Sequence, residues 1–449
     1  MEQEKRKMIL SAMMFFPAGE QISSWRHPKA EAEGLLNFDY YKRIVQTAER
    51  GKFDLFFYAD ELYVWDDFES SVKYANSIRP EPFTLLSALS VVTNHIGLGA
   101  TISTTYNEPY HIARKLATLD HLSGGRTAWN IVTSRTDEEA QNFGKEKHLL
   151  HERRYERAKE FIDVTEGLWD SWEDDALLFD KESGHFANNN KLHYLQHKGP
   201  EFSVRGPLNV ARPPQGYPVL IQAGASEAGK ELAAATAEVV FAPKGTLEEG
   251  MHLYQDIKGR MARYGRSDQH LKILPGIMPV IGRTKEEAEE KLAAIDNLIP
   301  WQLGLDLLSH EIGEDLSVYP LDEPLPFLPD IESANKSKSK LLAVRKLMEK
   351  ENVTLRQLCK RFNSRGIAGT PEQIADQLEE RFVNKAADGF NIAFPYLPGA
   401  LDDFVDLVVP ELQRRGLFKT EYSGKTLREN LGLERPRNRF TTTHVNGEK

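Results

Sequence analysis

Eight apolar, β-rich segments alternate with amphipathic helical stretches along this chain of 449 residues. Such alternation is typical of consecutive βαβ units, which form a parallel sheet covered by helices. Eight units close into a barrel more readily than they tile an open sheet. The sequence therefore predicts the α/β class and a (β/α)8 TIM barrel. The predicted strands are residues 9–16, 53–60, 96–103, 126–134, 218–225, 238–244, 273–282 and 389–396.

Two long segments interrupt this alternation, and we interpret both as insertions into a single barrel domain, residues 1–432. Residues 171–217, after the fourth strand, contain hairpin-like sequence. Residues 284–370, after the seventh strand, combine a helix, a Pro-rich stretch and a charged helix at 336–358. Long insertions near the active face of a barrel commonly act as lids or substrate walls, and a separate small domain is the alternative here. Residues 433–449 are interpreted as a peripheral C-terminal tail.

The composition excludes several classes of function. A formal net charge of −10 argues against a sequence-independent grip on nucleic acid, which needs clustered Lys and Arg. The sequence also lacks a run of ~20 apolar residues for a membrane span. Its single cysteine, Cys359, excludes a disulfide framework and a multi-cysteine metal site, and fits a reducing compartment. We expect a cytoplasmic protein with neither nucleic acid nor a membrane as partner.

Polar residues gather around the ends of the third and fourth predicted strands, between residues 101 and 134. Barrels of this type place their chemistry at the carboxyl ends of strands, so we expect the active site there. Asp60 ends the second strand in the same way, which favours ligand contact, although a cap for the following loop is the alternative. The residues in the 101–134 block are Thr101, Ser103, Thr104, Asn107, His111, Asn130, Thr133 and Ser134.

The segment QAGASEAGK (222–230) joins a predicted strand to a predicted helix. Helix N-terminal amides beside small residues such as Gly224 and Ser226 are suited to binding phosphate. The spacing also matches a P-loop, but Glu231 stands where Ser or Thr must ligate magnesium, which argues against nucleoside triphosphate hydrolysis. An N-capped helix after a tight turn is the alternative interpretation.

Other residues also suggest ligand contact. His151 and Tyr155 are four residues apart in a predicted helix, so they share a face and can donate to one phosphate or polyol. An ion-paired surface helix is the alternative. His27, in SWRHP (24–28), and His310, in the second insertion, are candidate proton donors or substrate-binding groups, whereas a solvated loop histidine is the simpler interpretation.

Two further motifs are too incomplete to support a site. His193 and His197 have zinc-like spacing but lack an intervening Glu and a third ligand, so we expect no metal. A G-x-G-x-x-G motif after a strand is absent, which leaves a Rossmann nicotinamide site without support.

The chain resembles the bacterial-luciferase-like flavin-dependent monooxygenases, on ordered blocks that span nearly the whole sequence. It is most similar to the subgroup that acts on nitrilotriacetate, dibenzothiophene sulfone and N-acetyl-S-alkylcysteines. The blocks include SWRHP (24–28), AERGKFDLFFYAD (48–60), TLDHLSGGRTAWNIVTS (118–134), HERRYERA (151–158) and QAGASEAGK (222–230).

This resemblance implies an enzyme that receives reduced FMN from a separate NAD(P)H-dependent flavin reductase. With molecular oxygen it would oxygenate a small sulfone, thioether or aminopolycarboxylate, and it would form a homodimer or homotetramer. The implied cofactor-binding residues are Asp60, Thr101, Ser103 and Asn130 toward the flavin ring and ribityl chain, and His151, Tyr155, Ala225 and Ser226 toward the phosphate. The candidate catalytic residues are His310, His27 and Asn130. Glu61 departs from the family, which tends to have Gly there.

Three other functions stay open at this point. A deazaflavin-dependent hydride-transfer enzyme would use the same barrel without oxygen. A non-catalytic flavin-binding protein would keep the phosphate residues, but it would not need the long second insertion. A metal-dependent barrel isomerase or hydrolase would need carboxylate and histidine ligands on several strand ends, where only Asp60 is evident.

Overall fold

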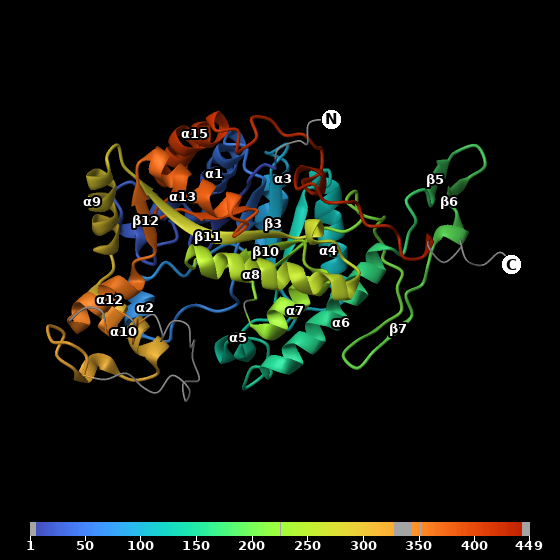
Figure 1. Ribbon diagram of the computed structural model, residues 1–449. Coiled ribbons are helices and arrows are strands. Elements are labelled where there is room, and N and C mark those ends of the chain that lie inside the picture. The colour runs from blue at the N-terminus through green and yellow to red at the C-terminus, as the bar shows by residue number, and fades with distance from the viewer. Residues whose placement is uncertain (1–5, 225, 327–343, 346, 350–352, 442–449) are drawn as a thin grey trace.

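The computed structural model describes residues 6–224, 226–326, 344–345, 347–349 and 353–441 (Figure 1). Eight parallel strands form a closed barrel, because β11 pairs back onto β10, the strand at the other end of the series. All eight predicted strands are confirmed, and so is the TIM-barrel fold. In barrel order the strands are β1 (Ile9–Met14), β2 (Leu55–Tyr58), β3 (Gly97–Ser103), β4 (Thr127–Val132), β9 (Val219–Gln222), β10 (Val239–Ala242), β11 (Lys272–Ile281) and β13 (Gly389–Ala393).

Side chains at alternate strand positions fill the barrel interior, as the two-residue period of a strand requires. The remaining strand positions, such as Leu10, Phe56 and Trp129, belong to the larger core between strands and helices. The interior apolar residues are Ile9, Leu55, Phe57, Ala128, Val219, Ile221, Val239, Phe241 and Leu274.

The short helix α16 (Leu427–Asn430) closes the amino-terminal end of the barrel. Leu427 belongs to the interior cluster, and its side chain lies so close to Gly97, at the start of β3, that a Cβ there would be 2.6 Å from Leu427 Cδ1. The amino-terminal end of the barrel is therefore filled by the apolar side chain of Leu427.

Helices cover the outside of the barrel, and local sequence signals explain several of their ends. Thr246 and Glu249 form a capping box at the start of α8, and Gly124 ends α4 in a left-handed conformation. None of the helices in the described part of the chain combines the length and apolar content that a membrane crossing needs. The main covering helices are α1 (Phe38–Arg50), α3 (Pro82–Ser90), α4 (Pro109–Ser123), α6 (His151–Trp169), α7 (Glu227–Thr236), α8 (Leu247–Arg260), α13 (Pro371–Val383), α14 (Gly399–Asp403) and α15 (Val409–Arg414).

The first predicted insertion, residues 171–217, contains two antiparallel hairpins. They are β5 (Leu177–Asp180) with β6 (His185–Ala187), and β7 (His197–Lys198) with β8 (Ser203–Val204). Figure 1 shows the β5–β6 hairpin projecting from the barrel on the right, away from the helices of the second insertion.

In the part that the structure describes, the second predicted insertion, residues 284–370, includes several helices and one strand. α10 packs against α2 (Glu69–Tyr74), a helix that follows β2, and Ser70 donates a hydrogen bond to Asp306. Much of the Pro-rich stretch and of the charged helix expected at 336–358 lies outside the described residues. The described elements are α9 (Lys285–Asp296), α10 (Trp301–Ile312), α12 (Leu355–Asn363) and β12 (Gly366–Gly369), which pairs with the end of β11.

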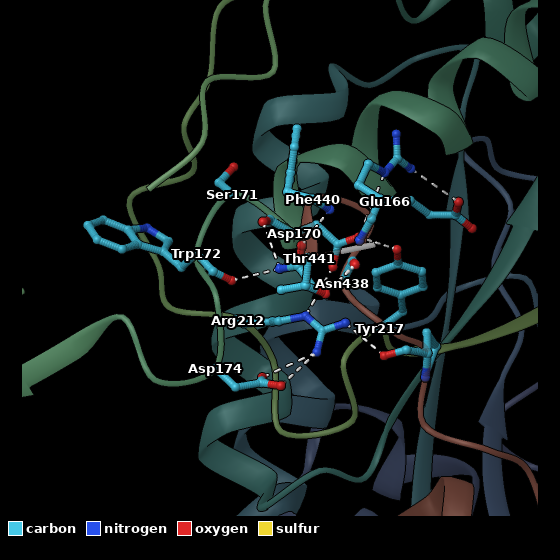
Figure 2. Close-up of polar contacts among 12 residues, drawn as sticks. Glu166, Asp170, Ser171, Trp172, Asp174, Arg212, Tyr217, Asn438, Phe440 and Thr441 are labelled. Atoms are coloured by element: carbon cyan, nitrogen blue, oxygen red, sulfur yellow. Dashed lines mark hydrogen bonds and ion pairs between the residues drawn. The ribbon is translucent and has the colours of Figure 1, made fainter. Parts of the chain in front are cut away.

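The segment at 435–441, in the expected peripheral tail, is anchored to the first insertion (Figure 2). Arg212 donates to Asp170 at 3.0 Å, and it also donates to the carbonyl of Pro436 at 2.8 Å. Asn438 is buried and donates to the carbonyls of Asp170 and Trp172. This part of the tail therefore satisfies buried polar groups, while residues 442–449 lie outside the described part of the chain.

We expect Arg212→Leu to lower the free energy of unfolding by about 3 kcal/mol, because the buried Asp170 carboxylate loses its closer charged partner and keeps Arg439, at 3.7 Å, as the remaining one in the described chain. The matched control is Arg414→Leu, which removes an exposed guanidinium group from Glu411; it should cost less than about 1 kcal/mol, because Glu411 keeps its pair with Arg415. Denaturant unfolding followed by fluorescence and circular dichroism measures both. Equal losses in the two variants would show that the Arg212 contact does not stabilise the fold in this way.

Candidate active site at the carboxyl ends of the strands

Thr101 and Asn130 face each other across β3 and β4 at the carboxyl end of the barrel. They are register partners, and Asn130 Nδ2 donates to Thr101 Oγ1 at 3.0 Å. Both side chains are buried, yet Asn130 Oδ1 has no hydrogen-bond partner among the described residues. A buried acceptor without a partner is costly, so this oxygen is a place for a donor from a ligand.

Ser103 continues the same wall at the end of β3. Its hydroxyl lies 3.0 Å from that of Ser134, which in turn lies 2.8 Å from Glu139 Oε1. Ser134 adopts a left-handed backbone conformation (φ 55°), which is uncommon for a non-glycine residue. Glu139 was not among the predicted site residues. The signal that could have indicated it is the capping box that Thr136 and Glu139 form at α5 (Asp137–Gln141).

Asp60 lies just beyond β2 and is partly buried. Burial raises the pKa of its carboxyl group to about 7, although the positive charge of Arg79 opposes the shift. A carboxyl group that titrates near neutrality can both hold and release a proton at physiological pH.

Three separate segments meet at the turn between β9 and α7. Ser226 caps α7, and its hydroxyl accepts a hydrogen bond from the amide of Gly229 at 3.1 Å. A Cβ added at Gly224 would lie 3.0 Å from Gly229 Cα and 3.1 Å from the hydroxyl oxygen of Tyr155. The glycines therefore let the strand end, the helix start and α6 approach closely.

The rings of His151 and Tyr155 lie together beside this turn, with centroids 4.8 Å apart. The neighbouring Arg154 reaches from α6 to the carbonyl of Ser134, and its Nε is buried with no partner in the described chain. Gln222 Oε1, at the end of β9, is also buried without a hydrogen-bond partner among the described residues. Arg154 and Gln222 were not among the predicted site residues, although both lie in sequence blocks on which the family resemblance depends. Ala225 lies outside the described residues.

The corner formed by His151, Arg154, Tyr155, Gly224 and Ser226 is called the anion corner below. It combines a helix N-terminus, a cation and two ring side chains with hydrogen-bonding groups. These features suit a phosphate group. Adjacent strands connect this corner to the barrel mouth, because Asn130 is level with Ile221, three residues before Gly224.

His27 lies at a different surface. Its ring stacks on Tyr396 at a centroid distance of 3.7 Å and lines a cavity of about 290 Å³ that also includes Lys291 and Asp403. Its Nδ1 accepts from the amide of Lys29, and burial together with the charge of Lys29 lowers the pKa of the ring. Neither the residues of the anion corner nor Asp60 lines this cavity.

His310 is exposed on α10, with its ring edge-on to Phe68 at 5.9 Å. It therefore belongs to the contact between the second insertion and the segment after β2, and not to the Thr101–Asn130 wall. The two histidines with zinc-like spacing bind separate carboxylates, since His193 contacts Glu173 and His197 contacts Glu160. Within the described ranges, no three metal-ligating side chains cluster.

Comparison with known proteins agrees with this architecture. The luciferase-like monooxygenase family model matches residues 16–389. N-acetyl-S-(2-succino)cysteine monooxygenase of Bacillus subtilis (strain 168) is 50% identical over 442 residues, which cover 97% of this chain and 99% of that protein. Nitrilotriacetate monooxygenase component A of Aminobacter aminovorans is 49% identical over 445 residues, with 96% and 98% coverage.

A solved structure gives the same result in three dimensions. The crystal structure of DmoA from Hyphomicrobium sulfonivorans matches with a TM-score of 0.86 at 33% identity, covering 95% of this chain and 92% of that one. The family resemblance in the sequence is thereby confirmed. The chain belongs to the luciferase-like monooxygenase family, and it is a flavin-dependent oxidoreductase on a TIM barrel.

Proposed function

We propose that this protein is the oxygenase component of a two-component system. It takes reduced FMN from a separate NAD(P)H-dependent flavin reductase and uses molecular oxygen to oxygenate a small sulfur compound or aminopolycarboxylate. The observation that carries this proposal is that Asn130 Oδ1, a buried acceptor without a hydrogen-bond partner among the described residues, lies on the strand next to the one that leads into the anion corner. The word "component" in the name of the nitrilotriacetate relative supports a separate partner.

The residues fit FMN at both ends. Ile221 lies level with Asn130, and Gly224 comes three residues after Ile221. At about 3.3 Å per residue, Asn130 and the anion corner are therefore about 10 Å apart. Such a spacing suits a flexible polyol chain between a ring and a phosphate. Thr101, Ser103 and Asn130 would hold the ring and polyol, and the anion corner, with the backbone at Ala225, would hold the phosphate.

Bound reduced FMN supplies the electrons that activate oxygen, and the protein supplies orientation and exclusion of water. Asp60 would hold a proton at the barrel mouth, where its carboxyl group titrates close to neutral pH. α10, packed on α2, forms a wall beside the segment that follows β2, and His310 lies in that wall. A direct catalytic role for His310 or His27 remains a prediction, as do the single-domain boundaries, a cytoplasmic location and a homodimer or homotetramer.

A deazaflavin-dependent hydride transfer is the second candidate, since it would use the same barrel and the same anion corner. The relatives that share about half of this sequence are monooxygenases, which favours the first candidate.

We expect Gly229→Ala to weaken FMN binding about tenfold or more, measured by fluorescence quenching of the flavin. The added Cβ would lie 2.9 Å from backbone atoms of Gly224, so the anion corner must open to accept it. Gly259→Ala in α8 is the matched control, because a Cβ there meets nothing within 4 Å. The control should keep its affinity for FMN. Unchanged affinity in Gly229→Ala would place the phosphate elsewhere.

We expect the stability of the wild type, relative to Asp60→Asn, to fall as pH rises from 4 to 7. Burial raises the pKa of Asp60 from 3.8 to about 7, so the folded state holds this proton more tightly than the unfolded chain. The resulting stabilisation is complete below pH 3.8 and is lost as pH rises through the folded-state value. Denaturant titrations at several pH values measure the difference. Parallel profiles for both proteins would contradict the shift, and the exposed Asp66→Asn serves as control.

A further inference from the structure

Arg79 lies in the loop between α2 and α3, against aromatic residues that directly follow β1. Its guanidinium carbon is 4.1 Å from the centroid of the Phe15 ring and 5.7 Å from that of Phe16. Phe16 in turn packs edge-on against Trp65 at 5.2 Å. The cation is therefore held on an apolar wall, where water is partly excluded and electrostatic interactions are stronger than in bulk solvent.

The guanidinium group of Arg79 makes few hydrogen bonds within the described residues. Nη2 makes one long hydrogen bond, 3.4 Å, to the carbonyl of Ser77, and Nη1 is buried with no hydrogen-bond partner among the described residues. A second donor in the same loop, Asn76 Nδ2, is also buried and without a partner in this part of the chain. Buried donors are normally satisfied, so two of them in one loop indicate a missing acceptor.

The nearby carboxyl groups do not supply that acceptor. Arg79 interacts electrostatically with Glu20 and Asp60, and Glu20 Oε2 is itself buried without a hydrogen-bond partner, but no carboxylate of the described residues accepts a hydrogen bond from Arg79. Burial raises the pKa of both carboxyl groups to about 7, and Arg79 opposes each shift. Near neutral pH these groups are only partly ionised, which leaves positive charge at Arg79 for an external anion.

We infer that Arg79 and Asn76 bind a carboxylate of the substrate. The planar guanidinium fork matches the two oxygens of a carboxylate, and the amide of Asn76 adds a donor from the same loop. This inference rests on the proposed function and narrows it. The substrate is a carboxylate-bearing thioether or amine, whereas an uncharged sulfone or sulfide would leave both donors unpaired.

The position of Arg79 supports this assignment. Phe15 and Phe16 come immediately after β1, and Asp60 comes two residues after the end of β2, so the charge of Arg79 lies at the carboxyl ends of the strands, where such barrels place their active sites. N-acetyl-S-(2-succino)cysteine and nitrilotriacetate, the compounds named in two relatives, both carry several carboxylates. A purely structural Arg79, held only by its aromatic contacts, would not discriminate between charged and uncharged ligands.

The test measures ligand binding by calorimetry on the full-length protein loaded with oxidised FMN. The probes are N-acetyl-S-(2-succino)cysteine, nitrilotriacetate and uncharged dibenzothiophene sulfone. We expect the wild type to bind at least one of the charged probes and to prefer it to the sulfone. Arg79→Gln should weaken that binding roughly 10- to 100-fold, and Arg79→Lys should weaken it less, because a point charge keeps the attraction without the bidentate geometry.

Arg414→Gln, an exposed arginine on α15, is the matched control and should bind the charged probe as the wild type does. Should Arg79→Gln fail to fold, Asn76→Ala is a second variant, which removes a donor without changing the charge. We expect it to bind the charged probe about fivefold more weakly. Affinity for that probe within twofold of wild type in a folded Arg79→Gln would overturn the inference. So would a wild type that takes up FMN yet binds neither charged probe, or binds the sulfone as tightly. Failure to take up FMN at all would instead contradict the proposed function.

Discussion

The register between β3, β4 and β9 is the constraint on which the candidate site depends. Parallel pairing sets Thr101 opposite Asn130, and Asn130 opposite Ile221, three residues before the turn at Gly224. Because successive side chains of a strand alternate in direction, a slip of one residue would turn Asn130 from the barrel interior to the helical layer. β9 ends at Gln222 and α7 begins at Glu227 after a short turn, so the N-terminus of α7 follows the strand that pairs with β4.

The other end of the barrel is used for stability. Leu427 fills the space above Gly97, and the neighbouring Arg428 is buried, pairs with Glu238 before β10 and donates to the carbonyl of Tyr217 at 3.0 Å. Charged groups buried there are paired, as expected for structural positions. Arg428 Nε nevertheless has no hydrogen-bond partner among the described residues, and the same holds for one polar atom each of Asn130, Arg154 and Arg79 at the opposite end. What distinguishes Arg428 from Arg79 is its carboxylate partner, Glu238.

Local patterns predicted much of this architecture, because strands, helices and capping boxes are properties of short segments. All eight barrel strands and the Ser226 cap follow from periodicity and turn residues. The roles of Arg79 and Glu139 did not follow, since each depends on neighbours brought close only by the closed barrel. The environment of His27 is a similar case. Its loop follows the first strand, but its ring stacks on Tyr396, 369 positions later in the chain, at a cavity separate from the anion corner.

A crystal structure of the protein with FMN tests the central claim most directly. The account predicts phosphate density at the turn between Gly224 and Glu227, within hydrogen-bond distance of the Ser226 hydroxyl or the first amides of α7. It also predicts the flavin ring beside Asn130, with a ring N–H donating to Asn130 Oδ1. Phosphate density at another strand end, or a ring that leaves Asn130 Oδ1 buried and unpaired, would contradict the account.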